Sequence, residues 1–204
     1  MAKRKTTAGR AAEIARTTRE TEIRTRVNLD GAGKADVASG VGFFDHMLEA
    51  LAKHAALNLE LNCRGDTHVD DHHTVEDIGI VLGQAVAQAL GDKAGIRRYG
   101  FGSVPLDEAL AQATIDLSGR AYFAFTGREH LRGGKIGTFD VELIEDFLAA
   151  FTQGAGATLH VEVRSGRNAH HVVEAAVKAV ARALRQAVER DERIAGVPST
   201  KGVL

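Results

Sequence analysis

The chain has 204 residues, 44% of them hydrophobic, which is enough for one sizeable core or two small fused halves. A formal net charge of −1 provides no global field that would attract nucleic acid or an anionic membrane, and we expect neither as a partner. The single cysteine, Cys63, excludes an internal disulfide and fits a reducing compartment, so the predicted location is cytoplasmic.

The first residues of the chain are strongly basic, with six cations before position 20 against only Glu13. No apolar stretch of the signal-peptide kind follows them. We expect residues 1–17 to form a flexible basic arm, with an organellar transit peptide as a minor alternative. Residues 18–204 are then a single domain.

Apolar residues that alternate with polar ones, or recur at helical spacing, predict the elements of the first half. In chain order these are a half-buried strand over 23–29, a turn over 30–33, a hairpin partner over 34–41, an amphipathic helix from Phe43 to Leu51, a strand over 57–63, and a helix from His72 to Leu90 ended by Gly91.

The second half repeats this order. It contains predicted strands over 98–106, 109–119 and 121–125, a glycine-rich loop over 132–137, a helix from Phe139 to about Thr152, a strand over 159–163, and a helix from the second His-His pair to about Arg190.

One polar cluster occurs twice, each time at the start of an alanine-rich helical pattern. Residues 70–77 read Asp-Asp-His-His-Thr-Val-Glu-Asp, and residues 168–175 read Asn-Ala-His-His-Val-Val-Glu-Ala. Adjacent helical residues point about 100° apart, so neighbouring histidines cannot easily serve the same ion. A single pair of this kind is more often a polar cap or a solvated face. The repetition of the pair with its Glu predicts two transition-metal sites.

The repetition extends beyond the cluster. At an offset of 100, the apolar positions of the helix at Phe44–Leu51 fall on Ile144–Phe151, and those of the strand at Leu59–Cys63 fall on Leu159–Val163. The His-His pairs are 98 apart, since 170 − 72 = 98. The predicted fold is therefore α+β, with two pseudo-symmetric ββαβα halves (about 18–93 and 94–191) from an internal duplication, each a sheet packed against helices, followed by a carboxy-terminal tail.

The repeat also pairs His46 with Asp146. If His46 is a metal ligand, then its counterpart is a carboxylate. Oxygen donors shift the preference of a site toward harder ions such as manganese.

Several motifs together resemble the imidazoleglycerol-phosphate dehydratase family, over nearly the whole chain from about Thr18 to Leu204. These motifs are Phe43-Phe44-Asp45-His46-Met47-Leu48, Gly65-Asp66-Thr67-His68, Asp71-His72-His73-Thr74-Val75-Glu76-Asp77, Pro105-Leu106-Asp107-Glu108-Ala109, Asp116-Leu117-Ser118-Gly119-Arg120, Ala169-His170-His171 with Glu174 and Lys178, and Pro198-Ser199-Thr200-Lys201-Gly202.

The resemblance implies a hydro-lyase of histidine biosynthesis that converts imidazole glycerol phosphate to imidazole acetol phosphate and water, with two manganese(II) ions per active site holding the ring as imidazolate. It implies a ribosomal protein S5 domain 2-like fold and assembly from trimers into a large octahedral homo-oligomer with active sites between subunits. It also implies two ligand sets: His46, His73, His170 and Glu174 for one ion, and His72, Glu76, His171 and Asp146 for the other. Close relatives often have histidine where this chain has Asp146.

The remaining site residues are also carried over by motif. Glu20 is the expected acid/base group, and Glu174 and His72 are expected to share in catalysis. The cationic and polar residues expected to hold the substrate and its phosphate, together with Glu20, are His54, Arg98, Arg120, Lys178, Ser199 and Lys201. The tail would thus contribute to substrate binding.

Two other classes of protein fit part of this pattern. A metal-storage protein would account for the histidine pairs but not for the separate set of cations. A two-metal phosphohydrolase would also use manganese and cations, although more Asp ligands would be expected, and its turnover would release inorganic phosphate.

Overall fold

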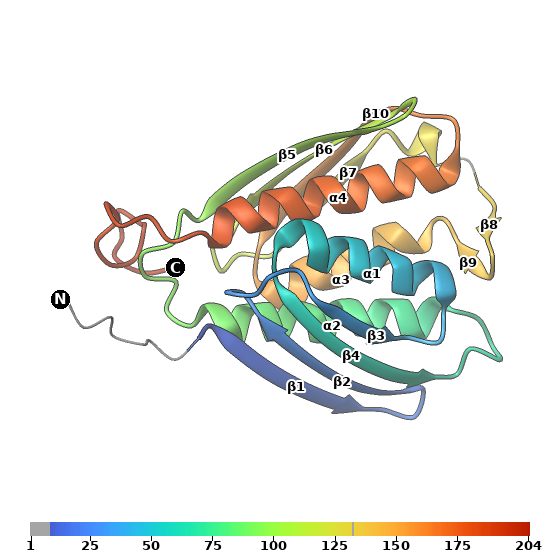
Figure 1. Ribbon diagram of the computed structural model, residues 1–204, viewed down its shortest axis with the longest axis horizontal. Helices are drawn as coiled ribbons and strands as arrows, with labels where there is room; N and C mark the ends of the chain where they lie inside the picture. Colours follow the sequence, from blue (N-terminus) through green and yellow to red (C-terminus); the bar gives the residue numbers. More distant parts are fainter. Residues whose placement is uncertain (1–8, 132) are drawn as a thin grey trace.

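Four α-helices lie between two four-stranded sheets in the computed structural model, which describes residues 9–131 and 133–204 (Figure 1). The first half contains β1 (Ala11–Thr17), β2 (Thr21–Asn28), β3 (Ala35–Ala38), α1 (Gly42–Ala55), β4 (Asn58–Gly65) and α2 (His72–Leu90). The second half contains β5 (Tyr99–Leu106), β6 (Ala109–Asp116), β7 (Tyr122–Thr126), the short strands β8 (Lys135–Ile136) and β9 (Phe139–Asp140), α3 (Leu143–Ala155), β10 (Thr158–Ser165) and α4 (Ala169–Val188).

The two sheets have the same topology. Their strand orders are β1-β2-β4-β3 and β5-β6-β10-β7, with the last strand of each sheet parallel to its neighbour and the others antiparallel. Each strand therefore has a counterpart in the other half, which confirms the α+β fold and the duplication. The halves read βββαβα rather than the predicted ββαβα, because each has a third strand before its first helix.

The core is continuous across both halves. Helix α2 packs on the first sheet and α4 on the second, while α2 contacts α3 and α1 contacts α4 between the sheets. Fully buried aromatic rings fill the space around α1 and α3, with Phe44 against Phe147 at a ring-centroid separation of 5.0 Å. The helix starts that carry the histidine pairs thus sit on a close-packed apolar core.

The prediction of a flexible arm over residues 1–17 is wrong for its second part, because residues 11–17 form β1 and pair along their whole length with β2. Ala12 is buried on the inner face, and Arg16 forms an ion pair with the buried carboxylate of Asp77 on α2. The high charge of this stretch hid the alternation of a half-buried edge strand. Residues 1–8 lie outside the described residues.

Two further predictions require correction. The expected hairpin partner over 34–41 does not pair with β2; the strand there, β3, is parallel to β4, and β2 has β1 and β4 as its neighbours. The helix expected from Phe139 begins at Leu143, because Phe139 and Asp140 form β9. Phe139 is fully buried and packs on Phe44, so its apolar character reflects tertiary contact rather than helical periodicity.

Candidate metal and substrate site

Both histidine pairs lie in the first turn of a long helix. The side chain of Asn168 accepts hydrogen bonds from the backbone N–H groups of His170 and His171, and Asp70 accepts one from the N–H of His72. These contacts satisfy N–H groups that have no partner within the helix. The histidine side chains are thereby presented at one end of the helical layer.

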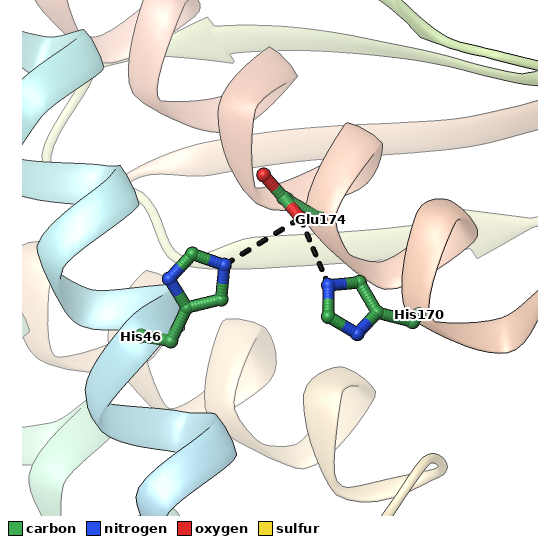
Figure 2. A group of neighbouring side chains, drawn as sticks. All are labelled: His46, His170 and Glu174. Carbon is green, nitrogen blue, oxygen red and sulfur yellow. Dashed lines mark hydrogen bonds and ion pairs between the residues drawn. The ribbon is translucent and has the colours of Figure 1, made fainter.

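His46, His170 and Glu174 form a compact group between α1 and α4 (Figure 2). The Nε2 atom of His46 lies 3.5 Å and that of His170 lies 3.1 Å from the same carboxylate oxygen of Glu174. A ligand atom from each residue lies within 4.8 Å of the other two. Two imidazole nitrogens converging on one carboxylate oxygen fit a transition-metal ion.

The duplicate group on α2 and α3 is more open. The two ring nitrogens of His72 each lie 3.9 Å from a carboxylate, Nε2 from Glu76 and Nδ1 from Asp146, and all three side chains are nearly half exposed. Its donor set is richer in oxygen because Asp146 stands where the first group has His46. Such a set suits a harder divalent ion.

The second histidine of each pair points to a different carboxylate. The Nδ1 atom of His73 lies 3.0 Å from Asp66, and that of His171 lies 2.8 Å from Glu108. These hydrogen bonds raise the pKa of both imidazoles, while the bond from His171 lowers the pKa of Glu108 to about 2. A carboxylate on Nδ1 leaves Nε2 as the metal-binding atom, which is the usual arrangement of a histidine ligand.

One chain therefore brings together three of the four predicted ligands for the first ion, whereas for the second ion Glu76 and Asp146 lie near different ring nitrogens of His72. His73 does not join His46, His170 and Glu174, and His171 does not join His72 and its two neighbouring carboxylates. The two histidines of each pair point to different carboxylates, as expected for adjacent helical residues, which point about 100° apart. His73 and His171, which lie outside these groups, each have Nδ1 hydrogen-bonded to a carboxylate, as histidine ligands of metal ions usually do.

A cationic pocket lies at the other end of α4, where the carboxy-terminal tail folds over the ends of β5 and β6. It has a volume of about 690 Å³, and its lining includes the predicted residues Arg98, Arg120, Ser199 and Lys201. Arg98 donates from Nε and Nη2 to the two oxygens of Asp116, at 2.7 and 3.1 Å, and from Nη1 to the carbonyl of Pro198. The bond to Asp116 raises the pKa of Arg98 further, so the guanidinium is a permanent cation.

A second pocket, of about 410 Å³, adjoins the His46 group and is lined in part by Lys53, His54, Glu174 and Lys178. Burial alone would raise the pKa of Glu174, but the ammonium of Lys178, 2.5 Å away, and His170 lower it below its ordinary value. Burial lowers the pKa of His54, assisted by Lys178 and Arg182. Glu174 is thus held as a carboxylate and His54 as a neutral ring.

The cationic pocket and the metal groups are far apart within one chain. The backbone N–H of Arg98 donates to the carbonyl of Ala187, near the end of α4. Since 187 − 170 = 17 residues separate it from His170 along the helix, the two ends are about 25 Å apart. One small molecule cannot reach both ends of the same chain.

Glu20 lies in the turn between β1 and β2, with a carboxylate oxygen 3.8 Å from Nε2 of His73. The sequence motifs did not single out Asp66, Glu108 or Asp116 for any role, although all three hold predicted site residues in place. All three stand inside the quoted motifs, which is the signal that could have identified them. Their partners are distant in sequence, so spacing alone did not reveal the contacts.

The geometry agrees with comparisons to known proteins. The family model described as "Imidazoleglycerol-phosphate dehydratase" matches residues 39–184. The chain belongs to this family. Curated dehydratases of the same name from Granulibacter bethesdensis and Desulforamulus reducens are 59% and 56% identical over 196 and 195 residues, covering 96% of this chain and 99% and 98% of the relatives.

Two solved structures of family members share the fold. The dehydratase from Staphylococcus aureus subsp. aureus N315 aligns with a TM-score of 0.80 and 38% identity over 89% of this chain and 99% of its own. That from Pyrococcus furiosus, in complex with (S)-C348, has a TM-score of 0.79 and 34% identity over 94% and 100%. The predicted enzyme class, a hydro-lyase of histidine biosynthesis, is confirmed. None of the helices in the two described ranges is long and apolar enough to cross a membrane.

Proposed function

We propose that the protein removes water from imidazole glycerol phosphate to form imidazole acetol phosphate, in an active site that two or more copies of the chain build together. The observation that carries this proposal is the separation of about 25 Å, along α4, between the metal-ligand groups and the cationic pocket. A substrate with an imidazole at one end and a phosphate at the other needs both kinds of site, and here they must come from different copies.

The donor set supports two manganese(II) ions. His46, His170 and Glu174 would hold one ion, completed by His73 of another copy, and His72, Glu76 and Asp146 would hold the second, completed by His171. Nitrogen and oxygen donors without thiolate suit Mn²⁺, and the buried Cys63 is no competitor. When bound, the ions would supply Lewis acidity that favours the imidazolate form of the substrate ring.

The remaining chemistry falls to side chains of the protein. A carbon-bound proton must be removed and the leaving hydroxyl protonated, and Glu20 is the proposed acid/base group because its half-exposed carboxylate stands beside the free nitrogen of His73. Glu174 and His72 support this step by holding the ring in place. Arg98 and Arg120, with Ser199 and Lys201 from the tail, would hold the phosphate.

Shared sites require self-association, and the proposed assembly is of trimers joined into an octahedral homo-oligomer. Each metal group then meets the second histidine of a neighbouring copy, and Lys178 and His54 of one copy face the cationic pocket of another. The buried, unpaired Cys63 is compatible with the reducing conditions of the cytoplasm.

The reaction is tested with metal-stripped protein, with and without Mn²⁺, by following ketone product and free phosphate. Manganese-dependent ketone without phosphate supports the dehydratase. Phosphate release would favour a phosphohydrolase instead, and tight manganese uptake without either product would leave a metal-storage protein.

Shared sites are tested by mixing two variants. His170→Ala removes a metal ligand and Arg98→Ala removes a phosphate donor, so each alone should lose most of its activity when assayed at a substrate concentration below KM. When the two are dissociated and reassembled together, about a quarter of the sites should combine two intact parts and recover activity. A mixture as inactive as its components would refute sites built from different copies.

A further inference from the structure

The duplication extends to the hairpin at the edge of each sheet. Ala11 pairs with Asn28 and Tyr99 pairs with Asp116, so β1–β2 and β5–β6 share one register at a constant offset, since 99 − 11 = 88 and 116 − 28 = 88. At this offset Glu20 in the first turn corresponds to Glu108 in the second, since 108 − 20 = 88. Both hairpin turns therefore place a glutamate beside the histidine pair of their own half.

The two glutamates have different surroundings. Both oxygens of Glu108 accept hydrogen bonds: Oε1 from the backbone N–H of Asn168 at 2.9 Å and of Arg167 at 3.4 Å, and Oε2 from Nδ1 of His171 at 2.8 Å. The carboxylate ties the β5–β6 turn to the start of α4. Because a carboxylate only accepts, Nδ1 of His171 must carry the proton.

Glu20 does not hold the ring of a histidine at Nδ1 in the first half. Its side chain is half exposed, and its contact with His73 is at Nε2, 3.8 Å away, rather than at Nδ1. The Nδ1 atom of His73 is held by Asp66, from the loop after β4. Asp66 thus accepts the hydrogen bond from Nδ1 of His73, as Glu108 accepts the one from Nδ1 of His171.

We propose that Glu108 is a positioning residue that holds His171 with its Nε2 atom turned outward as a metal ligand for a neighbouring copy, whereas its duplicate Glu20 has been released for proton transfer. This inference rests on the proposed function. The duplication has divided two roles between equivalent glutamates: one orients a ligand and the other faces the substrate.

Glu108→Gln tests the proposal with almost no change of shape. Glutamine offers one acceptor oxygen where glutamate offers two, so its amide nitrogen must face either the backbone N–H groups or Nδ1 of His171. If the nitrogen faces His171, the ring loses the acceptor that fixes its orientation and its Nδ1 proton; if it faces the backbone, the tie to the start of α4 is lost and the side chain that holds the ring is no longer anchored. Removal of such an outer contact typically weakens metal binding 10–100-fold, roughly the loss expected here for one of the two Mn²⁺ ions.

The measurement is Mn²⁺ binding to metal-stripped full-length protein by calorimetry, as a double-mutant cycle with His171→Ala. If Glu108 acts through His171, then Glu108→Gln weakens binding in the parent chain but has no further effect when His171 is already absent. Glu162→Gln is the matched control, because it removes a charge from the exposed face of the same sheet, where Glu162 pairs only with Arg164 among the described residues.

The outcomes separate the two proposals. An equal loss in both backgrounds would mean that Glu108 supports the fold and does not position His171, which overturns the inference. Unchanged binding in Glu108→Gln, with a loss in His171→Ala, overturns it as well but leaves the proposed function standing. Unchanged binding in His171→Ala would remove His171 from the ligands and contradict both the inference and the proposed ligand set of the second ion. Glu20→Gln should show the opposite signature, with turnover lost and Mn²⁺ affinity kept.

Discussion

Helices α2 and α3 approach so closely that only glycine fits between them. We therefore expect a larger residue at this contact to destabilise the protein. A Cβ atom at Gly83 would lie 2.3 Å from the carbonyl oxygen of Phe151 and 2.7 Å from the backbone nitrogen of Ala155. Gly154 meets α2 in the same way, with a Cβ 2.4 Å from the carbonyl of Ile80. Backbone atoms cannot rotate away, so Gly83→Ala must move a helix.

The size of the effect follows from these distances. Ordinary contact begins near 3.4 Å, so the helices must separate by about 1 Å, since 3.4 − 2.3 = 1.1. Overpacking of this kind costs about 2–3 kcal/mol, offset by about 1 kcal/mol of helix propensity that alanine gains over glycine. The net loss of about 1–2 kcal/mol corresponds to a fall in Tm of roughly 2–8 °C for a chain of this size.

The separation of α2 from α3 should also disturb the group formed by His72, Glu76 and Asp146. His72 and Glu76 lie on α2 and Asp146 on α3, so separating the helices widens the 3.9 Å contact between His72 and Asp146. Thermal unfolding of metal-free Gly83→Ala and Mn²⁺ titration of the same sample measure both effects. Gly42→Ala is the control, since a Cβ at the start of α1 meets nothing within 4 Å. A Gly83→Ala protein as stable as Gly42→Ala would refute the reasoning.

Three other outcomes are expected. Arg98→Ala should raise KM about 10–100-fold through the loss of charge-assisted hydrogen bonds to phosphate, with Mn²⁺ affinity unchanged in calorimetry. Asp146→His should shift metal preference from Mn²⁺ toward Zn²⁺ in competition titrations, because imidazole replaces an oxygen donor. Asp66 and Glu108 raise the pKa of His73 and His171 above 6.5, and only neutral imidazole binds metal, so protons should weaken Mn²⁺ binding as the pH falls through these raised values. The titration should span pH 6 to 8, which includes the ordinary histidine pKa of roughly 6.5. A Mn²⁺ affinity that does not change over this range would contradict the last expectation.

The duplication and the main elements could be predicted from the sequence because they rest on local patterns. The spacing of His72 and Glu76 on one helical face, the alternation in β2, β4 and β10, and Gly91 at the end of α2 depend on neighbours within a few residues. The same periodicity separates the two histidines of each pair and predicts two sites, whereas the ligand sets themselves were implied by the family resemblance.

Other features depended on contacts between residues distant in the chain. Whether β3 pairs with β2 or β4 is decided by which edges are free, and the basic residues of β1 gave no sign of the sheet they join. The carboxylates that hold His73 and His171 come from a loop and a hairpin turn that no spacing rule connects to α2 and α4.

The sequence by itself determined which residue types occur at which helical and strand positions, because these follow from backbone periodicity. Only the tertiary structure decided that His46 and Glu174 meet within one chain and without His73, that Glu108 and not Glu20 orients a histidine, and that the cationic pocket lies a helix length from His170. The physical reason is that the packing of two sheets about four helices sets these distances, and packing is a property of the whole chain.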